Sequence, residues 1–254
     1  MKSFRLLAPV LLGAMVSVAG CSSSDNEEKA VLANMGAQQL YDRAKQSMEV
    51  GNFSAAAQTL SALDSRYPFG PLSHQVQLDL IYSYYKSGKN EETLATIDRF
   101  IRLNPNHSDV DYAYYMRGLT NMESDSNLFQ ELMNIDRTDR DPSKSRAAFE
   151  DFRRLIQQYP DSKYAADAKQ RMVHIKDRLA RYEIAIARFY MRRQAYVAAA
   201  NRGRYVIEHF SNTTQVQQAL EIMVSSYEQL GLDELRNNAM KTLKLNYPDS
   251  EFIS

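Results

Sequence analysis

Apolar side chains recur at helical spacing along most of the chain, and glycine or proline interrupts them at regular intervals. Between residues 75 and 86 the apolar positions are Val76, Leu78, Leu80, Ile81, Tyr84 and Tyr85, close to the 3.6-residue period of a helix. Gly88 permits the positive φ of a helix end, residues 91 to 102 form a second stripe, and Pro105 stops it. Two helices joined by a tight turn within about 34 residues are typical of the tetratricopeptide (TPR) repeat.

The same unit recurs in four imperfect copies, in which apolar or small residues mark the helices and glycine or proline marks the turns. The markers are Leu40, Ala44, Gly51, Leu60 and Pro68 in the first copy, Gly118, Ala148, Phe152 and Pro160 in the third, Ala187, Tyr190, Ala199 and Val206 in the fourth, and Leu220, Tyr227, Gly231, Leu243 and Pro248 in the fifth. The sequence therefore predicts an all-α protein, an α-solenoid of about five TPR-like helix pairs.

Two stretches depart from the repeat. Residues 164 to 190 are helical in pattern without a clear breaker, which predicts one long helix or two nearly collinear ones. Residues 123 to 142 form a charged insertion between the helices of the third copy, either a contact-bearing projection or a solvated loop. We therefore expect N-terminal repeats 1–3 in residues 37–162, and a linker helix with repeats 4–5 in residues 163–254.

The N-terminal segment predicts export and lipid attachment. Lys2 and Arg5 precede an apolar run of 13 residues, short of the roughly 20 that span a membrane, so residues 1–20 are predicted to be a signal peptide. Val18-Ala19-Gly20-Cys21 resembles the bacterial lipobox, in which the cysteine is acylated; an ordinary signal peptide with a chance cysteine is the alternative. Residues 21–36 are expected to be a flexible, lipidated tether. Ser22 after the cysteine predicts sorting to the outer membrane, facing the periplasm.

Charge is balanced overall but uneven locally. The full chain has 31 basic and 31 acidic side chains, and removal of the signal leaves the mature chain at net −2. Residues 167 to 204 hold ten basic side chains against three acidic ones. This bias indicates either a solvated helix face or a docking surface for an acidic partner. Without net basic charge or a recognised nucleic-acid module, nucleic-acid binding is not predicted. The single cysteine cannot form an internal disulfide.

Catalytic motifs are lacking, so the prediction is a binding protein with no cofactor or metal and no enzyme activity. The four histidines share no motif, and the sequence contains no zinc-protease motif, phosphate loop or nucleophile elbow. The expected binding surface is the groove lined by first helices, with candidates Tyr41, Lys45, Gln77, Asp79, Tyr82 and Tyr85. Tyr67 and Phe69 lie in a proline-flanked turn; tyrosine recurs at other repeat ends, whereas Phe69 does not, so Phe69 is the better contact candidate.

Specific stretches resemble the BamD family, TPR lipoproteins of the outer-membrane β-barrel assembly machinery. They are residues 66–85, which include Tyr-Pro-Phe-Gly-Pro, residues 97–105 (Ile-Asp-Arg-Phe-Ile-Arg-Leu-Asn-Pro), residues 116–122, and residues 139–142. The resemblance covers nearly the whole mature chain and is looser from residue 215 onward. It implies a non-enzymatic periplasmic scaffold held at the outer membrane.

The resemblance also implies partners and contact residues. Arg202 matches the family arginine that docks on a POTRA domain of the barrel protein BamA. Tyr67 and Phe69 fall in the region thought to engage C-terminal signals of unfolded barrel proteins. Small BamC-like and BamE-like lipoproteins are further expected partners. Two alternatives remain on the residues alone: a TPR lipoprotein of a pilus or DNA-uptake apparatus, which the general pattern also fits, and a cell-wall hydrolase, for which no acid pair or metal motif is present.

Overall fold

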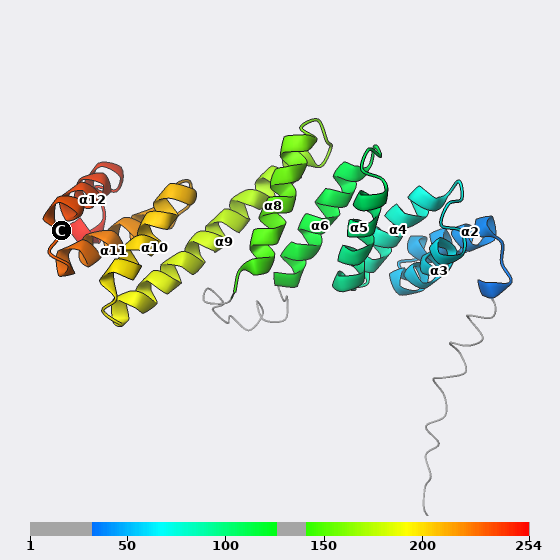
Figure 1. Cartoon of the computed structure of the whole chain (residues 1–254), viewed down its shortest axis with the longest axis horizontal. Helices are drawn as coiled ribbons and strands as arrows, with labels where there is room; N and C mark the ends of the chain where they lie inside the picture. Colours follow the sequence, from blue (N-terminus) through cyan, green and yellow to red (C-terminus); the bar gives the residue numbers. More distant parts are fainter. Residues whose placement is uncertain (1–31, 126–140, 254) are drawn as a thin grey trace, which may run out of the picture.

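The chain forms an elongated rod of paired helices (Figure 1). The computed structural model describes residues 32–125 and 141–253, and within these ranges it contains ten α-helices, a final 3₁₀ turn and no strand. The helices are α2 (Ala37–Glu49), α3 (Phe53–Arg66), α4 (Ser73–Lys86), α5 (Asn90–Leu103), α6 (Val110–Asp125), α8 (Ser143–Gln158), α9 (Ala165–Arg192), α10 (Tyr196–His209), α11 (Val216–Gln229) and α12 (Asp233–Asn246), followed by η1 (Glu251–Ile253).

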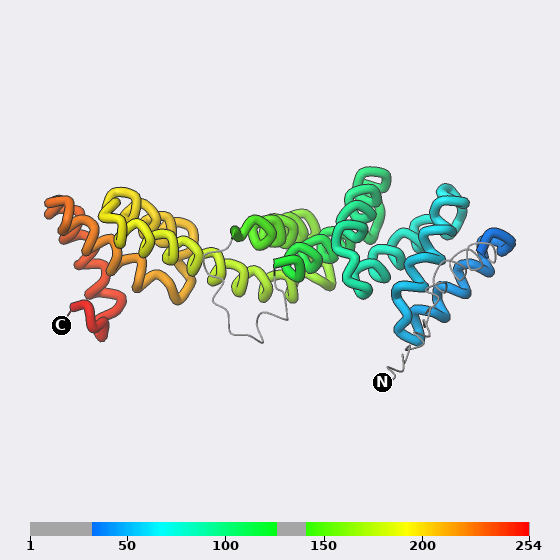
Figure 2. The backbone as a smooth tube through the Cα atoms, turned by 90° about the horizontal axis from the view of Figure 1, so that it is seen from below, coloured from blue at the N-terminus to red at the C-terminus, as the bar shows by residue number. Residues whose placement is uncertain are grey.

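Consecutive helices pack as five hairpins, α2/α3, α4/α5, α6/α8, α9/α10 and α11/α12, and each hairpin packs on the next. Figure 2 shows these hairpins following one another along the rod from the N-terminal to the C-terminal end. First helices also contact the first helices of adjacent hairpins, α4 with α6 and α9 with α11. This arrangement is that of a TPR-like solenoid, and the predicted fold class is confirmed.

The turns inside the hairpins share one backbone design. Gly51, Gly88 and Gly231 adopt φ of 76°, 71° and 67°, the left-handed conformation that glycine takes without strain. In the fourth hairpin Gln194 takes this position with φ 58°. The turn still closes in the same way, because the amide N of Ala195 donates to the carbonyl of Tyr190 at 2.9 Å. The sequence shows no breaker there because this turn forms without glycine or proline.

Close helix contacts hold the hairpins together around buried aromatic rings. Phe100 and Phe152 are fully buried in the larger of two hydrophobic clusters, which runs from α4 to α11. A Cβ on Gly118 of α6 would lie 2.4 Å from a ring carbon of Phe152 in α8. A Cβ on Gly203 of α10 would lie 2.8 Å from the backbone oxygen of Ala219 in α11. Both positions therefore require glycine for the observed helix spacing.

Three boundaries refine the sequence prediction. The predicted tether ends before residue 36, because Leu32 is buried on the first hairpin and Arg66 Nη1 donates to the carbonyls of Leu32 and Met35 at 3.2 and 3.0 Å. The predicted insertion begins later than residue 123, because α6 continues to Asp125. Residues 165 to 192 form one continuous helix rather than two. The predictions for residues 1–31 and 126–140 lie outside the described residues.

Candidate functional site

The first helices of the N-terminal hairpins carry tyrosines that meet across repeat boundaries. We call this set the tyrosine face: Tyr41, Tyr82, Tyr85, Tyr112, Tyr115 and Tyr164. Tyr115 of α6 stacks on Tyr164, at the start of α9, with ring centroids 4.7 Å apart, and Tyr112 lies 5.7 Å from the same ring. Tyr82 of α4 packs edge-on against Phe53 of α3 at 5.6 Å. These contacts form a row of aromatic side chains along repeats 1 to 3, half-buried except at the more exposed Tyr82.

Carboxylates fix the hydroxyls at both ends of this face. Tyr41 Oη donates to Asp79 Oδ2 at 2.9 Å, and Tyr115 Oη donates to Asp167 Oδ2 at 2.6 Å. Burial of the hydroxyl and then the neighbouring Asp79 raise the pKa of Tyr41 to about 12. Burial and the hydrogen bond to Asp167 likewise raise the pKa of Tyr115 to about 12. These tyrosines are therefore neutral hydrogen-bonded groups at physiological pH.

The pKa of the acceptor Asp167 responds to the same contacts. Burial acts to raise the pKa of Asp167, but the hydrogen bonds donated by Tyr115 and Arg171 outweigh it and lower this pKa. Arg171 Nε lies 2.5 Å from Asp167 Oδ2. The carboxylate at this end of the face therefore stays ionised and is partly neutralised by its own arginine.

The predicted groove residues divide between this face and the core. Tyr41, Tyr82 and Tyr85 belong to the tyrosine face, and Lys45 lies beside it, 3.9 Å from Asp79. Gln77 is a correction: it is buried, and its amide donates to Asp64 Oδ1 of α3 at 3.2 Å, because it faces the second helix of the preceding hairpin. The sequence analysis missed three tyrosines of this face. Tyr112 and Tyr115 repeat the three-residue spacing of Tyr82 and Tyr85, and Tyr164 follows a repeat end.

Phe69 occupies a position that is polar in every other repeat. Five equivalent turns follow second helices, each with a backbone hydrogen bond between its first and fourth residues of 3.0 to 3.3 Å. The third residues of these turns are Phe69, Asn106, Asp161, Asn212 and Asp249. Phe69 is 96% exposed, and Tyr67, at the end of α3, is 37% exposed. The other four turns form with a polar residue at this position, so neither the turn nor the core requires the ring of Phe69.

Arg202 lies in a cluster that joins three helices, which we call the Arg–Glu–Arg cluster: Arg146 of α8, Glu183 of α9 and Arg202 of α10. Arg202 Nη1 donates to Glu183 Oε2 at 2.8 Å, and Arg146 Nη2 donates to Glu183 Oε1 at 3.1 Å. The hydrogen bond to Glu183 raises the pKa of Arg202 further. Glu183 is 1% exposed, whereas the arginine side chains are 48% exposed for Arg146 and 41% for Arg202. Sequence reasoning missed Arg146 and Glu183, whose proximity is a tertiary feature.

The basic bias of residues 167 to 204 is partly neutralised within the chain. Five of its arginines have acidic partners: Arg171 with Asp167, Arg178 with Asp125, Arg181 with Asp177, Arg202 with Glu183, and Arg204 with Glu208. The positive surface is therefore more restricted than the residue count indicates. Glu183 is distinctive among these acids because it is nearly fully buried and serves two arginines.

The remaining predictions concern chemistry and attachment. Within residues 32–125 and 141–253, no three potential metal-ligating side chains gather into one group. None of the helices in these described ranges is long and apolar enough to cross a membrane. Cys21, the predicted lipidation site, lies outside the described residues.

Sequence comparisons identify the family. Residues 33–243 match the YfiO family model, described as an outer membrane lipoprotein. The chain is 47% identical over 227 residues to the outer membrane protein assembly factor BamD of Vibrio cholerae, covering 89% of this chain and 92% of that protein. It is 36% identical to BamD of Neisseria meningitidis over 98% of this chain and 94% of that protein, and 37% identical to BamD of Pasteurella multocida over 97% and 91%. The chain therefore belongs to the BamD family of outer membrane protein assembly factors.

Proposed function

We propose that this protein acts in the assembly of outer membrane proteins as a non-enzymatic scaffold. The observation that carries the proposal is the similarity to curated assembly factors over nearly the full length of the chain. The solenoid supports it, because stacked helix pairs present long surfaces suited to extended or folded protein partners. In this proposal the protein is held at the outer membrane, facing the periplasm, by lipid on Cys21.

Lipid attachment has a direct test. Cys21→Ser should abolish incorporation of labelled palmitate and move the protein from the outer membrane fraction to the soluble periplasm. Two or more acyl chains supply stable anchoring, since each buried methylene contributes about 0.8 kcal/mol. Retention of the unlabelled variant in the outer membrane would contradict the anchor.

The proposed partner of the C-terminal half is a POTRA domain of BamA, with Arg202 in the contact. The exposure of Arg202 supports this role, because the guanidinium can reach an acidic surface while it holds Glu183. Arg202→Glu should greatly reduce the BamA that co-purifies from gently solubilised membranes. Arg204→Glu is a matched control on the same helix, since Arg204 is exposed and pairs with the exposed Glu208. Equal recovery of BamA with both variants would remove Arg202 from the contact. BamC-like and BamE-like lipoproteins are proposed to appear in the same preparation.

The proposed substrates are unfolded barrel proteins whose aromatic C-terminal strand signals bind near Tyr67 and Phe69. The full exposure of Phe69 at an otherwise polar turn position supports this assignment. Fluorescence anisotropy with a labelled C-terminal peptide of a barrel protein should show weaker binding to Phe69→Ala. Leu103→Ala, at an exposed apolar residue near the end of α5, should bind the peptide as the unmodified protein does. Similar affinities for all three proteins would exclude Phe69 from the signal site.

Depletion tests the function as a whole. Loss of the protein should reduce many outer membrane barrels at once. Loss of piliation or DNA uptake with normal barrels would instead support the alternative assignment to one of those systems.

A further inference from the structure

The Arg–Glu–Arg cluster carries more positive charge than its internal structure requires. A buried carboxylate needs one well-placed cation to offset its removal from water, and Arg202 supplies it at 2.8 Å. Arg146 adds a second guanidinium from the preceding hairpin, so two positive charges share one negative charge. Arg117 shows the opposite balance, since this one cation contacts both Asp98 and Asp151. The surplus charge at Glu183 is therefore a local feature of this junction.

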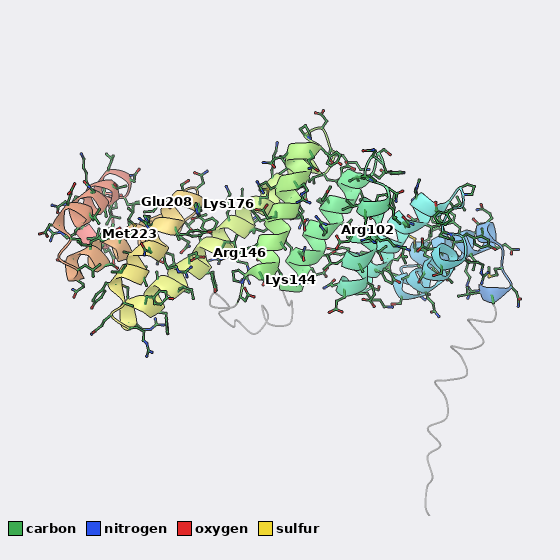
Figure 3. All side chains as sticks on the ribbon, viewed as in Figure 1. Arg102, Lys144, Arg146, Lys176, Glu208 and Met223 are labelled. Carbon is green, nitrogen blue, oxygen red and sulfur yellow. The ribbon has the colours of Figure 1, made fainter. Side chains whose placement is uncertain are left out.

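Both guanidiniums keep donors for another acceptor. An arginine has five N–H groups in a fixed planar fork. The ion pairs with Glu183 engage one Nη atom of each arginine, and Tyr190 is a further neighbour of the Arg202 guanidinium. Because Arg146 and Arg202 are half-exposed and Glu183 is not, an approaching partner would meet the two cations and not the acid. Arg146 lies near the start of α8 in the middle of the rod, where Figure 3 labels it beside Lys144.

We propose that Arg146 and Arg202 together bind the carboxylates of an acidic protein surface, and that Glu183 positions both arginines for it. This inference rests on the proposed function, in which Arg202 alone docks on the BamA POTRA domain. It extends the docking surface across the boundary between hairpins α6/α8 and α9/α10. A partner held by both arginines would also fix the angle between the N-terminal and C-terminal halves of the rod.

Glu183 acts here as a positioning residue and not as a competitor for the partner. Long arginine side chains lose rotamer freedom when they bind, and a buried carboxylate that already orders them reduces that loss on docking. The planar fork lets one guanidinium contact two carboxylates at once, as Arg117 does.

The first experiment measures the affinity of the purified POTRA domains of BamA for single variants. Arg146→Gln should raise Kd about tenfold, an effect typical of a close charge pair at an interface. Arg153→Gln is the matched control on the same helix, because Arg153 is similarly exposed but pairs with the exposed Glu150; its Kd should stay within about twofold of the unmodified protein.

The outcomes separate the two proposals. If Arg202→Gln weakens binding and Arg146→Gln does not, the present inference fails and the docking role of Arg202 stands. If neither substitution weakens binding, or the unmodified protein does not bind the POTRA domains, the proposed docking site fails and this inference fails with it. Arg146→Lys keeps the charge but lacks the planar fork, and it should raise Kd about threefold. Unchanged affinity of the Arg146→Lys variant would show that the planar guanidinium of Arg146 does not recognise the carboxylates of the partner.

The second experiment tests Glu183. Glu183→Gln preserves the shape and makes the surface more positive, so a purely electrostatic view expects tighter binding of an acidic partner. We expect about threefold weaker binding, because the arginines lose their orienting charge. The effect should shrink in an Arg202→Gln background, where one of the oriented arginines is absent. Tighter binding, or an undiminished effect in that background, would overturn the positioning role. Circular dichroism verifies that each variant is folded at the temperature used.

Discussion

The tyrosine face and the Arg–Glu–Arg cluster both contain a hydrogen-bonded carboxylate, but the two carboxylates lie in different environments. Asp167 at the tyrosine face is 44% exposed and accepts a hydrogen bond from a neutral hydroxyl as well as an arginine. Glu183 is buried and depends on two cations. Water solvates the first carboxylate in part, whereas the second relies on protein groups alone.

This difference predicts how the two surfaces recognise partners. The tyrosine face offers aromatic ring area, and the hydroxyl protons of Tyr41 and Tyr115 are already donated to carboxylates, so apolar and aromatic chain segments suit it. The Arg–Glu–Arg cluster offers positive charge, so an acidic folded surface suits it, and its binding should weaken with salt. The two surfaces therefore suit different kinds of partner. Stability measurements in four experiments test the structural basis of these differences.

The largest effect is expected when Glu183 loses both arginines. The double variant Arg146→Gln/Arg202→Gln leaves a buried carboxylate without a counter-ion, and its free energy of unfolding should fall by about 3–5 kcal/mol. Chemical denaturation followed by circular dichroism measures the loss. Adding Glu183→Gln to this background removes the isolated charge and should restore part of the stability. A double variant as stable as the unmodified protein would show that water, not arginine, compensates Glu183.

The second effect concerns the support of the tyrosine face. Gly118→Ala places a methyl group against the ring of Phe152, and the resulting overpacking should cost about 1–3 kcal/mol of unfolding free energy. Because Tyr115 lies on the same helix, its stacking on Tyr164 should be disturbed as well. Gly70→Ala is the control, since its nearest neighbour would be at an ordinary 3.6 Å. Equal stability of the two variants would mean that α6 and α8 separate without cost.

The third effect is a dependence on alkaline pH that belongs to the tyrosine face. The pKa of Tyr41 and of Tyr115 is raised to about 12, so the folded state holds these protons more tightly than the unfolded chain. Their stabilisation is complete below about pH 10 and is lost as the pH rises toward about 12. Since both side chains are only partly buried, screening by water limits the contribution of each to the order of 1 kcal/mol.

Urea unfolding between those pH values measures this loss. The variant Tyr41→Phe/Tyr115→Phe should lose less stability than the unmodified protein over the same interval. Absorbance titration at alkaline pH should also show the pKa of Tyr41 moving partway toward 10 in Asp79→Asn, because burial of the hydroxyl remains. Identical pH profiles for the double variant and the unmodified protein would show that groups other than Tyr41 and Tyr115 cause the loss of stability at alkaline pH.

The smallest effect on stability is expected at Phe69. Phe69→Ala removes a fully exposed ring, so the free energy of unfolding should change by less than about 0.5 kcal/mol. Thermal unfolding of both proteins measures the difference. A loss above 2 kcal/mol would show that the ring stabilises the turn and would weaken its assignment as a contact residue.

Local sequence patterns were enough to predict the helices and their pairing. The 3.6-residue spacing of apolar residues, with glycine near residues 51, 88 and 231 and proline after most second helices, defines local structure within each repeat. These signals depend on neighbouring residues alone, so they can be read without the fold. They failed at Gln194, where a left-handed turn forms without glycine, at the C-terminal end of the tether and at the start of the insertion.

Contacts between side chains of different helices depend on the tertiary packing and could not be predicted from these patterns. Gln77 follows the helical spacing of a groove residue, but packing against α3 buries it. Arg146 and Arg202 lie 37 and 19 residues from Glu183 in sequence, and both contact it because α9 packs against α8 and against α10. Periodicity fixes the direction of a side chain on its own helix, whereas its burial and its partners depend on the spacing and angle between helices.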